Sequence, residues 1–438
     1  MRTLCYTKYM EQIVDLHIHS HYSRATSREC TFEGLYKWGK LKGISVIGTG
    51  DFTHPEWFLE MREKLVPTPG GLFTLRPDIV AEVDAQLPET VRHQLLYFVP
   101  SVEIATIYKK LDRVRKLHQL IILPDFHAVS ELNARLEKIG NLKADGRPIL
   151  GLDSKELLRM TLDVTPEALY IPAHIWTPWF GLFGSKSGFE NLAEAYDDLA
   201  PEIRAIETGL SSDPPMNWRV KDLDGLAIIS NSDAHSPQKL GREATVVRAE
   251  PTYADVIGAI KTNDQRLAGT IEFFPHEGKY FADGHRACNV RFSPEETRVY
   301  GGICPVCKKP LVVGVNYRVG ELATRPLGEG DAAKQVEYII PLSEIIAELK
   351  NVRSVSSKAV VAECEAIYAT LGNEFDVLRK ISPEEIRAKG FELLALAVER
   401  LRAREVVLDP GYDGVYGTIR IFKDIAERQA TLNQLSLL

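Results

Sequence analysis

The sequence lacks the features that would place it in several protein classes. Cysteine is scarce, with 6 residues in a chain of 438, which argues against a small fold held together by disulfides. No apolar run approaches the roughly 20 residues that a membrane helix needs. The N-terminal segment also has no continuous apolar core of the kind found in secretory signals. These absences predict a cytoplasmic protein.

An excess of basic residues is also missing. The 53 Lys and Arg residues are outnumbered by 60 Asp and Glu residues, so the net charge is −7. This balance argues against a general nucleic-acid coat protein but not against a nucleic-acid enzyme, because metal sites use carboxylates. Hydrophobic residues make up 45% and charged residues 26% of the chain, a composition typical of folded proteins. The length predicts two or three domains at about 150 residues each.

Histidines and carboxylates follow apolar runs that resemble strands. In the first run His17 and His19 are two positions apart, so they share a face of a strand. An H-x-H sequence at a strand end favours a metal site over two buried histidines bonded to backbone carbonyls. The second run ends at Asp51 after Gly-Thr-Gly. A turn or cap role is the alternative for this aspartate.

Four later runs carry residues of the same types. Glu103 lies within the third, His127 and His174 end the fourth and fifth, and Asp233 and His235 end the sixth. The six runs occupy residues 13–19, 44–51, 95–107, 120–127, 168–174 and 226–235. Because they alternate with helix-like segments, they predict parallel strands with crossover helices. In an α/β barrel the carboxyl ends of such strands meet at one mouth.

The candidate ligand set is rich in histidine and in carboxylates able to bridge two metals. It comprises His17, His19, Asp51, Glu103, His127, His174, Asp233 and His235. This set exceeds the four ligands of one tetrahedral ion and fits two or three neighbouring ions such as Zn, Mn or Mg. Such centres suit phosphoester hydrolysis, since the metals activate water and neutralise the phosphate.

These motifs resemble the polymerase and histidinol phosphatase (PHP) superfamily over residues 13–270. The matching motifs are DLHIHS at 15–20, TGD at 49–51, VE at 102–103 and SDAH at 232–235. The resemblance implies a distorted (β/α)7 barrel with a trinuclear metal centre. Its usual pattern has histidine directly after the aspartate of TGD, whereas Phe52 stands here. His54 could take the place of this ligand, or the ligand could be missing. His21 follows His19 by two positions and could either bind a metal or lie in a loop at the rim.

A second chemical signal follows the predicted barrel. His285 and Cys288 precede Cys304 and Cys307 by a hairpin-sized segment. This spacing is typical of a zinc ribbon, in which two short knuckles hold one structural zinc. The alternative is a redox Cys-x-x-Cys, but those motifs precede a helix and none is expected here.

Barrel and ribbon together resemble the endonuclease Q family over essentially the whole chain. The added motifs include PAHIWTPWFGLFGSKSGF at 172–189, IETGLSSDPPMNW at 206–218 and PGYDGVYG at 410–417. The resemblance implies a DNA repair endonuclease that cuts 5′ of uracil, hypoxanthine, xanthine or an abasic site and leaves a 3′-hydroxyl and a 5′-phosphate. Asp233, His235 and Glu103 are the expected catalytic residues. The rival classes are a PHP-type phosphomonoesterase acting on small molecules and a non-catalytic, helicase-associated DNA-binding module.

Several residues are candidates for contact with damaged DNA. The aromatic loop after His174 could stack on a base or open the duplex, or it could simply plug the barrel. The next segment could hold a phosphate before a helix or only cap that helix. The arginines after the first histidines could contact the DNA backbone or only face solvent. The candidates are Arg24, Arg28, Trp176, Trp179, Phe180, Lys186, Ser187 and Ser211.

We expect a barrel at 1–275, a zinc ribbon at 276–320 and a mainly helical domain at 321–438. Helical spacing predicts helices over 341–350, 357–371, 383–389 and 391–404. The helical domain could clamp the ribbon on the barrel or grip DNA. The expected cofactors are two or three active-site metals and one structural zinc. The expected partner is damaged DNA, with other repair or replication proteins as further partners, and the chain is expected to be a monomer.

Overall fold

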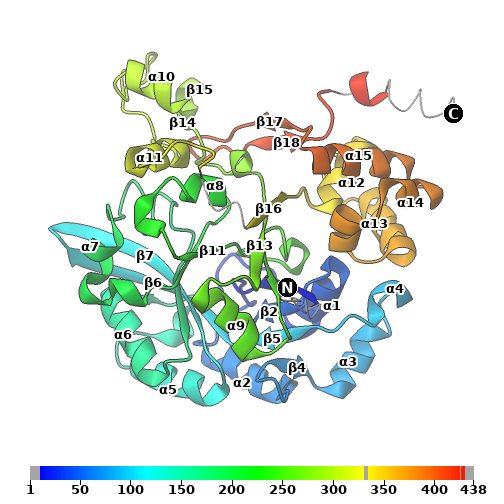
Figure 1. The fold of residues 1–438 in the computed structure, drawn as a ribbon, viewed down its shortest axis with the longest axis horizontal. Helices are drawn as coiled ribbons and strands as arrows, with labels where there is room; N and C mark the ends of the chain where they lie inside the picture. Colours follow the sequence, from blue (N-terminus) through cyan, green and yellow to red (C-terminus); the bar gives the residue numbers. More distant parts are fainter. Residues whose placement is uncertain (1–9, 330–333, 425, 430–438) are drawn as a thin grey trace, which may run out of the picture.

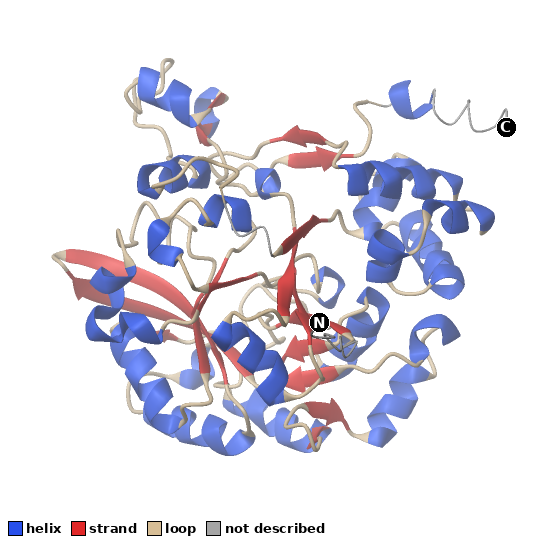
Figure 2. Ribbon diagram, in the orientation of Figure 1, coloured by secondary structure: helices blue, strands red, loops and turns tan. Residues whose placement is uncertain are grey.

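The computed structural model describes residues 10–329, 334–424 and 426–429. Strands occupy the middle of the molecule, and helices lie around them and along one edge (Figures 1 and 2). The predicted mixed α/β class is therefore confirmed. None of the helices in the described ranges has the length and apolar character needed to traverse a membrane.

The largest sheet contains eight strands in the order β16-β13-β12-β1-β2-β5-β4-β3. Their bounds are β1 Glu11–Asp15, β2 Val46–Gly48, β3 Leu65–Pro67, β4 Phe73–Leu75, β5 Tyr97–Val99, β12 Ala244–Arg248, β13 Leu267–Glu272 and β16 Gln335–Tyr338. Strands β1, β2 and β5 run parallel, whereas β12 is antiparallel to β1. The carboxyl ends of the parallel strands β1 and β2 lead directly to His17 and His19 and to Asp51.

A second sheet has the order β8-β6-β7-β9. Its strands are β6 Ser101–Lys110, β7 Arg113–Ile122, β8 Ile149–Leu150 and β9 Leu169–Pro172. Strands β6 and β7 form a long antiparallel hairpin, and β9 is antiparallel to β7. The prediction that the fourth run is a parallel strand with a crossover helix is therefore wrong. A separate parallel pair contains β10 (Ala205–Glu207) and β11 (Ala227–Ile229).

Nine helices of the first 265 residues cover these sheets in the described part of the chain. They are α1 Phe32–Lys42, α2 Pro55–Lys64, α3 Pro77–Asp84, α4 Glu89–Arg92, α5 Phe126–Leu136, α6 Ser154–Val164, α7 Leu192–Tyr196, α8 Pro214–Asn217 and α9 Tyr253–Thr262. Helix α1 begins at a side-chain cap, since Thr31 accepts a hydrogen bond from the Gly34 amide. It ends at Gly43, whose φ of 91° suits glycine.

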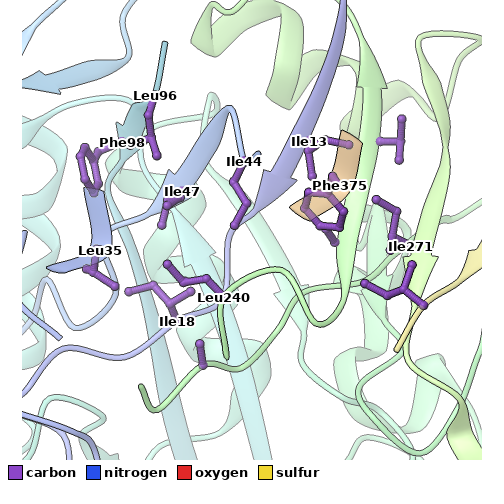
Figure 3. Close-up of a cluster of buried hydrophobic side chains, with 14 of the residues drawn as sticks. Ile13, Ile18, Leu35, Ile44, Ile47, Leu96, Phe98, Leu240, Ile271 and Phe375 are labelled. Atoms are coloured by element: carbon purple, nitrogen blue, oxygen red, sulfur yellow. The ribbon is translucent and has the colours of Figure 1, made fainter. Parts of the chain in front are cut away.

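The strands belong to several sheets rather than to one continuous hydrogen-bonded ring among the described residues. A closed seven-stranded barrel thus stays a prediction. The main core joins both halves of the chain. Figure 3 shows Phe375, from the C-terminal region, among Ile13, Ile44 and Ile271. Burying apolar surface from both regions in one cluster favours a rigid junction between them.

The predicted ribbon region is small. It contains β14 (Asp283–His285), paired with β15 (Val290–Phe292), followed by α10 (Pro294–Val299) and α11 (Val315–Leu322). Its own apolar cluster is limited to Val290, Cys304 and Leu311, with partly buried neighbours. In Figure 1 it projects from the top of the molecule. So small a core cannot stabilise an independent fold without a further constraint.

The C-terminal helices occupy the segments that the sequence pattern indicates. Their bounds are α12 Leu342–Lys350, α13 Lys358–Leu371, α14 Pro383–Ala388 and α15 Glu392–Ala403. Two strand segments cross the predicted domain limits. Strand β16 pairs with β13 of the main sheet, and the hairpin of β17 (Val407–Asp409) and β18 (Thr418–Arg420) lies between ribbon and helices (Figure 1). The domain limits stay a prediction.

Candidate metal centre

The first part of the site gathers around the two histidines that follow β1. His17, His19, Glu103 and Asp233 each offer one ligand atom, and these atoms lie within 4.8 Å of one another. The loop that carries Asp233 is held beside the histidines by a bond from the His19 amide to the Ala234 carbonyl. The structure therefore brings together four residues from three of the predicted strand-like runs.

Each of these histidines has a carboxylate behind it. The Nδ1 atom of His17 lies 3.0 Å from both oxygens of Glu207, and Nδ1 of His19 lies 3.1 Å from Asp51. Asp51 is held in turn by the amide and hydroxyl of Ser20. Carboxylates in this position orient a metal-binding imidazole and fix its tautomer. Asp51 therefore supports His19 and lies outside the metal-capable groups, so its prediction as a direct ligand is corrected.

A second group shares Glu103 with the first. One oxygen of Glu103 lies 2.5 Å from Nδ1 of His118 and 2.9 Å from Nε2 of His174. Its other oxygen lies 3.5 Å from Nε2 of His17 and 3.3 Å from Nε2 of His19. Glu103 thus presents one oxygen to each group, as a carboxylate that bridges two metal ions does.

The donor atoms fit a bound cation. Nε2 of His17 is buried and has no hydrogen-bond partner, although it faces Glu103 and, at 3.7 Å, Asp233. A buried polar atom without a partner costs free energy. A metal ion bound by this nitrogen and the neighbouring carboxylate oxygens would supply the missing interaction, and histidine with carboxylate is a usual ligand set for zinc and related ions.

The buried carboxylates around His17 and His19 also require positive charge nearby. Burial disfavours charged imidazole, but Glu207 and Glu103 outweigh it and raise the pKa of His17 well above its usual value. For His19, Asp233 and Asp51 likewise outweigh burial and raise the pKa. The carboxylates of the cluster therefore need a compensating cation, which is either a proton on these rings or a metal ion.

Three of the site residues adopt a left-handed backbone. The φ angles are 49° for Asp51, 30° for His174 and 47° for Asp233. Non-glycine residues rarely occupy this region, and such conformations concentrate at functional sites. All three follow a strand directly or within a few residues, so the unusual backbone turns these side chains toward the site at the point where regular structure ends.

His127 does not belong to the site. It lies exposed in the first turn of α5, after the end of β7. Because β7 is antiparallel to β9, the end of β7 lies beside the start of β9, whereas His174 follows the end of β9. The prediction of His127 as a ligand is therefore wrong. His118, from the middle of β7, takes the corresponding place in the second group.

Three other predicted histidines lie near the groups but outside them. The ring of His235 is 4.5 Å from that of His19, and its Nδ1 lies 2.9 Å from the Asp233 carbonyl. His54 precedes α2 and stacks on Tyr22. His21 lies 3.2 Å from the Cys30 carbonyl. His235 is thus a half-buried rim residue, and neither alternative ligand joins a metal-capable group.

The aromatic loop divides into buried and exposed members. Trp176 is 1% exposed and its indole donates to Asn217, so its prediction as a DNA contact is corrected to a core role. Trp179 is 43% exposed. The Phe180 ring lies 4.4 Å from that of His118 and is half-buried. Trp176 therefore plugs the barrel side, whereas contact of Trp179 and Phe180 with a base stays a prediction.

The predicted phosphate cradle is not formed as expected. The Ser187 side chain is buried, accepts from the Phe180 amide and donates to the Lys116 carbonyl, which corrects its prediction as a phosphate contact. The next helix, α7, begins later and is capped by Asn191. The remaining candidates stay accessible. Lys186, Arg24 and Arg28 are exposed, and Ser211 is partly buried.

The four predicted zinc ligands converge. His285, Cys288, Cys304 and Cys307 offer atoms within 4.8 Å of one another. The knuckle loop is closed by a bond from the Lys308 amide to the Cys304 carbonyl and by another from the Cys304 amide to the Lys309 carbonyl. This is a closed set of one nitrogen and three sulfurs, which is typical of a structural zinc site.

Sequence reasoning missed three residues of the main site. His118 and Glu207 are described above, and Arg147 places Nη1 3.0 Å from Glu103. Glu207 ends β10, the same kind of position as the predicted ligands, so a strand-end search could have found it. His118 is internal to a strand and Arg147 lies in a loop, and no local pattern marks either residue.

Comparisons with known proteins found similar families and relatives. A PHP-associated family model matches residues 218–264, and the model of the MJ0043 C-terminal domain matches 341–405. The uncharacterized protein YqxK of Bacillus subtilis is 26% identical over 86% of this chain and 89% of its own length. The uncharacterized protein MJ0043 of Methanocaldococcus jannaschii is 29% identical over 59% of this chain, and the match covers 33% of that protein.

Two solved structures match nearly the whole chain. The lesion-specific endonuclease PfuEndoQ of Pyrococcus furiosus has a TM-score of 0.81 and 28% identity, covering 98% of this chain and 99% of that one. Endonuclease Q in complex with a 27-mer duplex containing an abasic lesion has a TM-score of 0.79 and 29% identity, covering 94% and 97%.

The two adjoining metal-capable groups and the PHP-associated match at 218–264 agree with the PHP class of proteins. Similarity over the full length, including the ribbon and the C-terminal helices, narrows this class. Over nearly its full length the chain resembles endonuclease Q.

Proposed function

We propose that this chain is a DNA repair endonuclease that hydrolyses the phosphodiester 5′ to uracil, hypoxanthine, xanthine and abasic sites, leaving a 3′-hydroxyl and a 5′-phosphate. The observation that carries the proposal is Glu103, which offers one oxygen to each of two metal-capable groups. Similarity to an endonuclease Q solved with an abasic duplex supports the substrate class.

The residues divide between two metal positions. His17, His19 and Asp233 would hold one ion, and His118 and His174 the other, with Glu103 between them. When bound, the ions neutralise the phosphate and activate water for hydrolysis. In the ribbon, the His285, Cys288, Cys304 and Cys307 set would hold one structural zinc.

Other residues would position the substrate. Glu207 and Asp51 fix the rings of His17 and His19, so that both Nε2 atoms face Glu103 and the first metal position. Arg147 adds a partly exposed guanidinium beside Glu103, within reach of a phosphate oxygen. These residues supply orientation and charge before the substrate arrives, which is how enzymes lower reorganisation costs.

Lesion contact would fall to the rim. His235 is half-buried and can exchange a proton with the substrate at the edge of the cluster. Trp179 and Phe180 can contact a base or the gap that a flipped nucleotide leaves. Arg24, Lys186 and Ser211 remain candidates for phosphate contacts around this opening.

The test is a cleavage assay on an oligonucleotide duplex panel containing uracil, hypoxanthine, xanthine, an abasic site or no lesion. We expect the wild-type chain to cut 5′ of each lesion. The cut should leave a 3′-hydroxyl and a 5′-phosphate. His17→Ala should lose this activity, whereas the exposed His127→Ala is the matched control and should retain it. Equal cutting of undamaged DNA, or turnover of nitrophenyl phosphate alone, would overturn the proposal in favour of a general nuclease or a phosphomonoesterase.

A further inference from the structure

The PGYDGVYG motif at 410–417 has a clear structural role that leaves one side chain unexplained. Added Cβ atoms at Gly411 and Gly417 would fall 2.5 Å and 2.2 Å from backbone oxygens of Gly278 and His276. Both positions therefore require glycine, because the two backbones approach so closely. The motif packs a C-terminal loop directly against the segment that leaves the main sheet.

Backbone hydrogen bonds fix this loop. The Gly411 and Gly417 amides donate to His276 and Glu277, and the Gly414 amide donates to Lys279. Tyr412 forms a bridge to the strand-like segment at Ala282 and donates its hydroxyl to Asn289. A loop held at this many points has a defined conformation, so the exposure of its remaining side chains is a property of the fold.

Tyr416 is the most exposed side chain of this loop, with 68% of its surface accessible. The ammonium of Lys279 lies 5.7 Å from its ring centre and 5.6 Å from that of Tyr280. Lys279 forms no ion pair with a carboxylate in the portion of the chain that the structure describes. Two rings thus hold one uncompensated positive charge at the surface.

The same row of side chains reaches the metal centre. Trp179 meets Tyr280 edge-to-face at 5.7 Å, and its neighbour Phe180 lies against the ring of His118. From the second metal-capable group, the surface therefore continues through Phe180, Trp179 and Tyr280 to Lys279 and Tyr416. Aromatic rings alternating with a cation are the usual means of holding a nucleic-acid strand without reading its sequence.

We propose that Trp179, Tyr280, Lys279 and Tyr416 form a track that holds the DNA strand running from the metal centre toward the C-terminal loop. Lys279 would contact a backbone phosphate, and Tyr416 would pack on a sugar or base beyond it. The track gives the net acidic chain a local DNA-binding surface. This inference rests on the proposed function, since it assigns a binding role outside the catalytic groups.

The experiment measures binding of a fluorescent duplex containing an abasic analogue to the full-length chain carrying Asp233→Asn, over a range of salt. Adding Tyr416→Ala or Lys279→Ala should weaken binding about tenfold. Lys279→Ala should also reduce the slope of log K against log salt by about 0.9, the value for one phosphate contact. Tyr416→Phe keeps the ring and should bind as the parent does.

The matched control for charge is Lys109→Ala, because Lys109 is exposed at the tip of the β6–β7 hairpin. It should leave affinity and slope unchanged. The track is overturned if Tyr416→Ala and Lys279→Ala bind with the parent affinity while circular dichroism shows the same fold. Failure of the proposed function is distinguishable, since it appears as absent lesion cleavage by the wild-type chain, whatever the two track variants do to binding.

Discussion

The two candidate metal centres differ in how the chain builds them. The ribbon set comes from 23 consecutive positions, 285–307, and lies in a region with a very small apolar cluster. The main set comes from segments between His17 and Asp233 and is embedded beside the large core. A metal in the ribbon would therefore stabilise local folding, whereas metals in the main site would supply chemistry to a fold that stands without them.

The largest effect should come from the carboxylate that joins the two main groups. Glu103→Gln keeps the size of the side chain but removes the charge that both groups share. We expect lesion cleavage to fall by at least about 1000-fold, with little change in Tm because the surrounding core remains. Glu167→Gln, at an exposed position, is the control for removing one charge. Unchanged cleavage by Glu103→Gln would show that the groups do not share this residue.

Loss of a ribbon ligand should instead affect folding, and only in the ribbon region. Cys304→Ser should release the zinc and unfold the region around 285–310, since structural zinc supplies roughly 10 kcal/mol of local folding free energy. Limited proteolysis should then cut within this region while the main thermal transition stays. The control is Cys364→Ala, because Cys364 lies in α13, outside the metal-capable groups. This variant should keep the zinc of the ribbon. Cooperative unfolding of the whole chain by Cys304→Ser would remove the contrast between the centres.

The carboxylates behind the histidines should have intermediate effects. Glu207→Gln leaves all the metal-capable atoms in place but weakens the orientation of His17. Metal affinity or cleavage rate is expected to fall about 10- to 100-fold. Metal titration of the variant separates the two quantities, and the exposed Glu202→Gln serves as its control. An effect as large as that of Glu103→Gln would instead make Glu207 a direct ligand.

The smallest effect concerns a buried carboxyl that belongs to neither centre. Burial raises the pKa of Glu272 from 4.5 to about 8, although Ser230 donates to it. The folded chain then binds more protons than the unfolded chain between these values, so stability falls as pH rises from about 4.5 to about 8. Glu272→Gln should raise the stability near pH 9 and hardly change it near pH 5. Thermal unfolding at both pH values is the measurement, and an equal Tm shift at both would contradict the assignment.

The same contrast explains which predictions succeeded. The ribbon set depends on short spacing, and the structure brings together all four predicted residues. In the main site, His17, His19, Glu103, His174 and Asp233 also converge as expected. The predictions of His127 and Asp51 as ligands failed. The first depended on the direction of a strand, and the second on which nitrogen of the His19 ring the carboxylate contacts. The sequence pattern of 120–127 carries no sign that β7 is antiparallel, so it points to His127 at the end of the run and leaves His118 unmarked.

Asp51 illustrates the second failure. Its position after β2 is as expected, but it binds the far nitrogen of His19 rather than joining the cluster. A ligand and a supporting carboxylate have the same residue type and the same place after a strand, and only side-chain geometry separates them.

The C-terminal helices are predictable from the sequence, since helical spacing is a local pattern. The contribution of β16 to the main sheet depends on a contact between distant segments.

The most direct test of the account compares nicking of an abasic-site duplex by His118→Ala and His127→Ala under the same metal conditions. Both variants remove one imidazole, one within the shared cluster and one from the surface of α5. We expect His118→Ala to lose more than the roughly 100-fold that supporting residues contribute, and His127→Ala to match the wild type. Full activity in His118→Ala, or its loss in His127→Ala, would contradict the proposed metal centre.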